Sequence, residues 1–289
     1  MNDTEQKYWG IIHETFPELD IRDFAVLGHG KVAGTCLVNK NIVFKITDNS
    51  EKALKDTEHE IYLLKRIKQS LSFDVPKIVY DGRINNGGWV FGETLLSGVV
   101  YSQKLHDSFD DETKSDILRQ IGGIMRELHS VKINDDKNAL FVGDYKQNIA
   151  MFNRYFSDDV KKCFSSADIQ RINAVCDRYE YLSTHYPVDL VLVHADMHFG
   201  NFMFDKNTKK LTGLIDFGAA HFSEPARDMH YYYGDGAKGI LAGYGPTSDV
   251  YLPERQHFHS VTNFLENIGG YIQENLSPDN EIKKLMSIL

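Results

Sequence analysis

The sequence predicts an α+β protein with two lobes: an amino-terminal lobe built on a β-sheet and a carboxy-terminal lobe that is mostly helical. Between residues 24 and 96, short runs of alternating apolar and polar residues are separated by glycine and asparagine turns, with one helical stretch among them. From residue 111 onward, apolar residues recur mainly at the spacing of amphipathic helices. We therefore expect an amino-terminal lobe of residues 1–96 and a carboxy-terminal lobe of residues 97–289.

The amino-terminal lobe is predicted to begin with a helix and to continue with strands. Trp9, Ile12 and Phe16 have helical spacing, and Pro17 ends that run. Later residues alternate as strands do, and the glycine- and asparagine-rich segment 85–88 favours a tight turn. We predict five antiparallel strands and one main helix: two strands flanking the glycines at 28–34, strands at 42–47, 77–80 and 89–96, and the helix at 56–71.

The carboxy-terminal lobe is predicted to combine long helices with one short strand and one hairpin. The first long helix carries an apolar stripe and has acidic residues near its start, which its dipole favours. Further helices are rich in aromatic residues. The predicted elements are helices at 111–131, within 144–186 and within 258–289, a buried strand at 190–193, and a hairpin of 202–204 and 211–215 that turns at 205–207.

Four polar residues follow this strand and flank this hairpin. His194 and Asp196 lie in the loop after the strand, while Asn201 and Asp216 lie beside the hairpin, which would bring them to one metal site. Phosphoryl transfer needs these residue types, because one carboxylate orients or accepts a hydroxyl proton while an amide oxygen and a second carboxylate hold Mg²⁺ against a triphosphate. Capping and turn residues of an ordinary αβ segment are the alternative. The order of the motifs and the hairpin between them favour the phosphoryl-transfer interpretation.

Two features of the amino-terminal lobe fit the same chemistry. Gly28 and Gly30 lie between the first two strands, where glycine lets backbone N–H groups approach phosphate oxygens, although an ordinary turn uses glycine too. Lys45 alternates with Phe44 and Ile46, so its side chain points to the other face of the sheet. A strand lysine of this kind is either solvent-exposed or a phosphate ligand.

The segment from Leu190 to Asp228 resembles the catalytic core of the aminoglycoside phosphotransferase family, a branch of the protein-kinase-like fold that phosphorylates small molecules. After the Asp216-Phe217-Gly218 triplet, the sequence Glu224-Pro225-Ala226-Arg227-Asp228 is similar to the DPxxD motif of that family, with Glu where Asp is more usual. The segments HEIYLLKRI and Glu127-Leu128-His129 also resemble the family, the first of them its 2''-phosphotransferases. No room remains for a long activation segment, so a protein substrate is disfavoured.

The resemblance implies a bilobal protein-kinase-like fold and a role for each matched residue. It makes Asp196 the catalytic residue, Asn201 and Asp216 the ligands of Mg²⁺, and ATP or GTP the phosphate donor. Lys45 would bind the α- and β-phosphates and be held by Glu58 or Glu60, of which we prefer Glu60 because it opens the apolar face of its helix. The Thr94 carbonyl and the Leu96 N–H would pair with the edge of the purine. His194 and Asp228 would support the catalytic loop or contact the substrate, and Asp235 would contact the substrate. His129 would be a core residue.

Composition limits the partners. The formal net charge is −9, from 41 acidic and 32 basic residues, which disfavours nucleic acid and anionic membranes and slightly favours a cationic ligand. The sequence has no signal-like start and no apolar run long enough to span a membrane, so we expect a cytoplasmic protein, and we expect it to be a monomer. The three cysteines indicate neither a disulfide framework nor a zinc site.

The motifs predict Mg²⁺-dependent transfer of the nucleotide γ-phosphate to a small-molecule hydroxyl, and the resemblance implies an aminoglycoside antibiotic as acceptor, with resistance as the outcome. The segment 229–245 has Asp235 as its only acid, whereas aminoglycosides are polycations that favour several carboxylates. Its three tyrosines at 231–233 either stack on a sugar or cationic ring or belong to the core. A kinase of an amino alcohol, a sugar or a macrolide is therefore the alternative, and a nucleotide-binding protein without activity is a third possibility.

Overall fold

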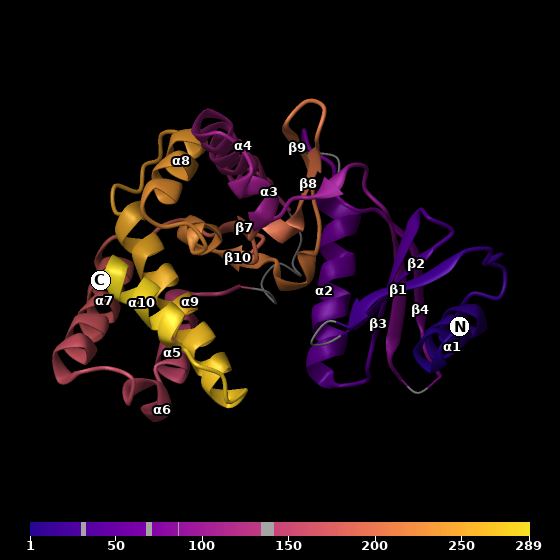
Figure 1. The fold of residues 1–289 in the computed structure, drawn as a ribbon, viewed down its shortest axis with the longest axis horizontal. Coiled ribbons are helices and arrows are strands. Elements are labelled where there is room, and N and C mark those ends of the chain that lie inside the picture. Colours follow the sequence, from indigo (N-terminus) through magenta and orange to yellow (C-terminus); the bar gives the residue numbers. More distant parts are fainter. Residues whose placement is uncertain (30–32, 68–70, 86, 134–141) are drawn as a thin grey trace. The chain divides into compact units, whose positions relative to one another are not determined.

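The structure is a computed structural model, and it describes residues 1–29, 33–67, 71–85, 87–133 and 142–289. Its contacts group the chain into two compact units, coloured by sequence in Figure 1. The amino-terminal unit comprises Met1–Ser102 and Phe199–Ala219, and the carboxy-terminal unit comprises Gln103–His198 and Ala220–Leu289. The lobe limits of 1–96 and 97–289 stay a prediction.

The amino-terminal unit contains the five-stranded antiparallel sheet that the sequence predicts. The strand order is β1-β2-β3-β5-β4, and each neighbouring pair is antiparallel. Helix α1 lies on one side of the sheet and helix α2 on the other. The elements are α1 (Asp3–Thr15), β1 (Phe24–His29), β2 (Ala33–Val38), β3 (Ile42–Thr47), α2 (Glu51–Ile67), β4 (Ile78–Arg83) and β5 (Trp89–Thr94).

Strand alternation divides the side chains of β3 between two apolar clusters. Phe44 and Ile46 are buried with Ile12 and Phe16 of α1, so Lys45 must point to the α2 side. On that side Phe91 of β5, the pairing partner of Lys45, packs in a second cluster. The predicted orientation of Lys45 is therefore confirmed.

A small sheet completes the amino-terminal unit and confirms the predicted hairpin. Strand β8 pairs with β9, and Val99 and Val100 of β6 pair along the other edge of β8. Asp74 connects this sheet to the segment before β4, since its N–H donates to the Thr212 carbonyl at 2.9 Å. The elements are β6 (Val99–Val100), the 3-10 helix η3 (Phe199–Asn201), β8 (Phe202–Asp205), β9 (Lys210–Leu214) and the 3-10 helix η4 (Phe217–Ala219).

The carboxy-terminal unit is mostly helical, as predicted. Its only paired strands among the described residues are β7 and β10, which are antiparallel. Asp110 caps the long helix α4 by accepting a hydrogen bond from the Thr113 N–H at 2.7 Å. The elements are α3 (Gln103–Asp107), α4 (Asp111–His129), α5 (Tyr145–Tyr155), α6 (Asp158–Lys161), α7 (Ser166–His185), β7 (Val191–Val193), β10 (His221–Ser223), the 3-10 helix η5 (Pro225–Met229), α8 (Asp235–Tyr244), α9 (Leu252–Gln273) and α10 (Asp279–Ile288).

Helices α4 and α8 approach each other closely because glycines lie at their contact (Figure 1). A methyl group on Gly122 of α4 would clash with the backbone of α8, and one on Gly243 of α8 would clash with the backbone of α4. The predicted apolar stripe of α4, including Ile117, Ile121 and Met125, is fully buried. This contact fixes where the end of α8 lies against α4.

The main apolar core of this unit surrounds α9. The rings of Tyr179 in α7 and Phe258 in α9 stack with centroids 3.7 Å apart. Phe152 of α5 and Leu285 of α10 belong to the same buried cluster. Among the described residues, no helix is both long enough and apolar enough to cross a membrane.

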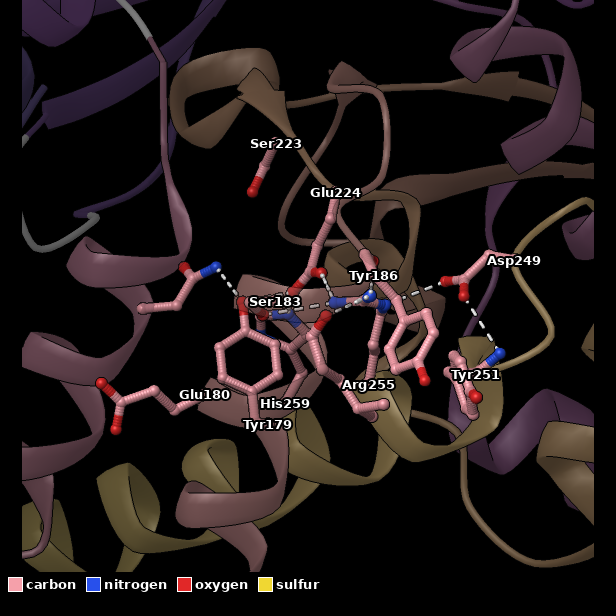
Figure 2. A network of polar contacts seen from close by, with 12 residues as sticks. Tyr179, Glu180, Ser183, Tyr186, Ser223, Glu224, Asp249, Tyr251, Arg255 and His259 are labelled. Atoms are coloured by element: carbon pink, nitrogen blue, oxygen red, sulfur yellow. Dashed lines mark hydrogen bonds and ion pairs between the residues drawn. The ribbon is translucent and has the colours of Figure 1, made fainter.

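A buried polar network lies beside this core (Figure 2). The Glu224 carboxylate accepts hydrogen bonds from Tyr179 and His259, and its other oxygen is 3.3 Å from Nη1 of Arg255. Arg255 is 1% exposed and also donates to the carbonyls of Leu182 and Tyr186. Glu224, the acidic residue at the start of the DPxxD-like segment, is thus held inside the protein by helices α7 and α9.

Candidate active site

Lys45 is the centre of an ion-pair cluster in the amino-terminal unit. Its ammonium Nζ lies 2.6 Å from Oε1 of Glu60 and 3.1 Å from Oδ1 of Asp216. Burial would lower the pKa of Lys45, but the surrounding carboxylates raise it well above its usual value, so the ammonium stays charged. The structure therefore brings together three of the residues that the sequence predicts, and the partner on α2 is Glu60, while Glu58 is exposed.

Glu93 supplies a third carboxylate of the cluster, and the sequence analysis did not predict it. Its Oε1 lies 3.9 Å from Lys45 Nζ, and its side chain is 5% exposed. Burial raises the pKa of Glu93 to about 7; Lys45 opposes this effect, whereas Glu60 and Asp216 add to it. Glu93 is the last residue but one of β5, where an acidic residue would ordinarily be expected to face solvent.

Asn201 and Asp216 lie at the open end of the β8–β9 hairpin. Phe202 pairs with Leu214, and the Ile215 N–H donates to the Asn201 carbonyl at 2.9 Å. Asp216 has a backbone φ of 66°, which is uncommon for a residue other than glycine, and its side chain is 55% exposed. The hairpin therefore brings these two residues of the chain together, as predicted, and presents one carboxylate and one amide.

The other predicted nucleotide-binding positions lie on the same unit. Gly28 is in β1 next to a bulge, while Gly30 lies outside the described residues. Thr94 ends β5, and its hydroxyl oxygen accepts a hydrogen bond from the Lys77 N–H at 3.0 Å. Leu96 is half-buried just beyond it, and its side chain lies over Gly213. Their contacts to a nucleotide stay a prediction.

Asp196 belongs to the carboxy-terminal unit, where Tyr231 holds it. The Tyr231 hydroxyl donates to Oδ1 of Asp196 at 2.5 Å, and burial together with this negative charge raises the pKa of Tyr231. His198 Nε2 lies 3.7 Å from Oδ2 of Asp196. The Asp196 side chain is 31% exposed. Its carboxylate is thus held by the Tyr231 hydroxyl and stays partly exposed to solvent.

Asp228 supports the loop that carries Asp196. Its oxygens accept hydrogen bonds from the backbone N–H groups of His194 and Ala195, at 3.0 Å and 2.6 Å, and contact Nε2 of His129 at 2.9 Å. Burial would raise the pKa of Asp228, but these hydrogen bonds and the interaction with His129 lower it overall. Ala195 has a φ of 64°, a conformation that Asp228 helps to hold.

His129, His194 and Asp235 complete the list of predicted positions. His129 is a buried residue whose Nδ1 contacts the Tyr244 hydroxyl at 3.0 Å, in agreement with its predicted core role. His194 is fully buried, and its backbone N–H donates the hydrogen bond to Asp228 that is described above. Asp235, by contrast, starts α8 with a side chain that is 95% exposed, and it pairs with Lys238 at 2.8 Å.

The three adjacent tyrosines play different roles. Tyr231 contacts Asp196, Tyr232 is buried and donates to the Met197 carbonyl at 2.7 Å, and Tyr233 is 38% exposed. Glu266 of α9 is an acid that the sequence analysis did not connect with this region. Its charge contributes to the raised pKa of Tyr231, and its Oε1 accepts a hydrogen bond from Tyr155 at 2.8 Å.

Comparisons with known proteins show the family and the fold to which the chain is similar. The model of a family described as the phosphotransferase enzyme family matches residues 27–247. The GDP and kanamycin complex of APH(2'')-IIIa is similar to this chain, with a TM-score of 0.83 and 21% identity over 98% of each chain. So is ADP-bound aminoglycoside phosphotransferase APH(2'')-Ib, with a TM-score of 0.66 and 16% identity over 100% of this chain and 97% of that one. A macrolide 2'-phosphotransferase type I has a TM-score of 0.63 and 18% identity over 91% of each chain.

The similarity to these solved structures shows that the chain has a kinase-like fold. The match to the family model shows that it is related to the members of that family. The matched residues make up well over half of the chain and include Lys45, Asp196, Asn201 and Asp216. The chain therefore belongs to the phosphotransferase enzyme family and is a small-molecule phosphotransferase with a kinase-like fold.

Proposed function

We propose that the protein transfers the γ-phosphate of ATP or GTP to a hydroxyl group of an aminoglycoside, in a reaction that depends on Mg²⁺. The observation that carries this proposal is the convergence of Glu60 and Asp216 on the largely buried ammonium of Lys45. A fixed, charged lysine is suited to bind phosphate oxygens, and a neighbouring carboxylate that is half-exposed is suited to bind a metal ion beside them.

Asn201 and Asp216 would hold the Mg²⁺. One amide oxygen and one carboxylate form a hard-oxygen donor set of the kind that Mg²⁺ takes from proteins, leaving its other positions to water and phosphate oxygens. The ion would neutralise charge on the phosphates when bound. Asp196 would orient the acceptor hydroxyl and take up its proton, while Tyr231 and Asp228 keep the carboxylate and its loop in position.

A cationic acceptor is supported by the carboxylates of the carboxy-terminal unit. Glu266 acts on Tyr231 electrostatically and so adds negative charge to the surroundings of Asp196. Kanamycin is bound by the similar APH(2'')-IIIa. We propose that phosphorylation of such an antibiotic confers resistance, and that the enzyme acts in the cytoplasm as a monomer.

A macrolide or another hydroxylated small molecule is the second candidate acceptor. Asp235, the only acid in segment 229–245, is engaged by Lys238 at 2.8 Å and is therefore partly neutralised. The likeness to a macrolide phosphotransferase also supports this candidate. An aminoglycoside would then lack one of the carboxylates that its amines need.

An assay of nucleoside diphosphate release by the purified protein distinguishes an aminoglycoside acceptor from the second candidate. The assay contains Mg²⁺, ATP or GTP, and aminoglycosides, macrolides, choline or sugars in separate reactions. We expect an aminoglycoside to stimulate release and to gain a phosphate, as seen by mass spectrometry. Turnover on another acceptor alone would favour the second candidate, and turnover on none would contradict both.

Replacement of Asp216 by alanine is expected to lower Mg²⁺-dependent turnover by about 10²-fold or more, because the site loses the carboxylate that we propose as a ligand of the ion. Titration of turnover against Mg²⁺ concentration checks this. Asp205→Ala, at the partly exposed end of β8 in the same hairpin, is the matched control and should keep its Mg²⁺ dependence. An Asp216 variant with wild-type turnover would remove the metal assignment.

A further inference from the structure

One oxygen of Glu93 has no hydrogen-bond partner in the described part of the chain. Oε2 is buried and accepts no hydrogen bond from any residue that the structure describes, while Oε1 is 3.9 Å from Lys45 Nζ. A buried carboxyl oxygen without a donor costs free energy, since water can no longer solvate it. A ligand that supplies a donor would remove this cost.

The position of Glu93 in the sheet indicates which ligand that is. Glu93 pairs with Val43, two residues along from the pairing of Lys45 with Phe91, so its side chain points to the same face as Lys45. It also directly precedes Thr94, whose carbonyl is predicted to pair with the purine edge. Glu93 thus lies between the lysine proposed to bind the phosphates and the segment proposed to bind the base.

We propose that Glu93 recognises the substituent at position 6 of the purine, and that it favours adenine over guanine nucleotides. This inference rests on the proposed function, in which the nucleotide binds to the amino-terminal unit. The 6-amino group of adenine is a hydrogen-bond donor, whereas the 6-oxo group of guanine is an acceptor. An ionised carboxylate only accepts, so it pairs with adenine and repels the oxygen of guanine.

Protonation would change this preference in a defined direction. The pKa of Glu93 is raised to about 7, and the charged groups that act on it are Lys45 from β3, Glu60 from α2 and Asp216 after β9. Above pH 7 the carboxylate predominates and disfavours guanine. Below pH 7 the protonated carboxyl predominates, and its O–H group can donate a hydrogen bond to the 6-oxo group of guanine.

Equilibrium binding of nucleotides without an acceptor tests the inference independently of phosphate transfer. Wild-type protein and Glu93→Gln are titrated with Mg²⁺ and the β,γ-methylene analogues of ATP, GTP and ITP at about pH 6 and about pH 8. The hypoxanthine base of ITP has the 6-oxo group without the 2-amino group of guanine, so it separates the two positions. Glu58→Gln, an exposed glutamate on α2, is the matched control.

We expect the wild type to bind the ATP analogue about tenfold more tightly than the GTP and ITP analogues at about pH 8, with a smaller ratio at about pH 6. In Glu93→Gln the ratio should fall toward one and lose its pH dependence, because a carboxamide both donates and accepts. An unchanged ratio in this variant would overturn the inference but not the proposed function. Failure of every nucleotide to bind would overturn both.

Discussion

Replacing Asp196 by asparagine is expected to lower kcat by roughly 10²- to 10⁴-fold while changing the KM for the nucleotide little. Asparagine has nearly the same shape and can still accept the hydrogen bond that Tyr231 donates to Asp196. It cannot take up a proton from the acceptor hydroxyl. The nucleotide contacts that we propose are all on the amino-terminal unit, whereas Asp196 is on the other.

Steady-state kinetics with saturating acceptor measure this effect, and thermal denaturation shows whether the variant is folded. Asp189→Asn is the matched control, because Asp189 is exposed and precedes the strand that leads into the same loop. Its turnover should stay close to that of the wild type. An Asp196→Asn enzyme with nearly normal kcat would contradict the catalytic role, and one that has lost its thermal transition would show that the carboxylate is structural.

Replacing Arg255 by methionine is expected to lower the free energy of unfolding by about 3–5 kcal/mol. The variant leaves the Glu224 carboxylate buried without its guanidinium and leaves the carbonyls of Leu182 and Tyr186 without their donor (Figure 2). Asp249 also loses its ion pair with Arg255, whose Nε lies 3.0 Å away. Methionine fills much of the volume but satisfies none of these groups.

Urea denaturation near neutral pH measures the loss. Arg178→Met is the control, since Arg178 forms an ion pair with Glu254 in which both side chains are 44% exposed, and loss of a solvent-screened pair should cost much less than loss of the buried one. The network lowers the pKa of Glu224 below its ordinary 4.5, so its stabilisation is present above that pH and is lost on acidification. Equal stabilities of the two variants would contradict the importance of the buried network.

The sequence predicted the parts of the site that follow from local rules. Alternation along a strand placed Lys45 opposite Phe44, and a hairpin placed Asn201 beside Asp216. An apolar helix face distinguished Glu60 from Glu58. These rules operate over a few residues, and the tertiary structure did not have to override them.

The residues that the sequence did not predict depend on contacts between distant segments. Glu93 is acidic at the end of a strand, and its burial follows only from the register of β5 with β3. Tyr231 is one of three adjacent tyrosines, and the 3-10 helix before them decides which one faces Asp196. Glu266 and Arg255 lie on α9, where charged residues ordinarily face solvent, so no local pattern separates one that is exposed from one that is buried.

The glycine contact between α4 and α8 supports the loop that carries Asp196 through a series of direct contacts. It places Tyr244 against His129, which contacts Asp228, and Asp228 holds Ala195. Glu266, in contrast, is on the distal half of α9. If Glu266 contributes to acceptor binding as we propose, we expect substitutions there to alter the choice of acceptor without moving this series of contacts, so substrate range could diverge while the reaction is retained.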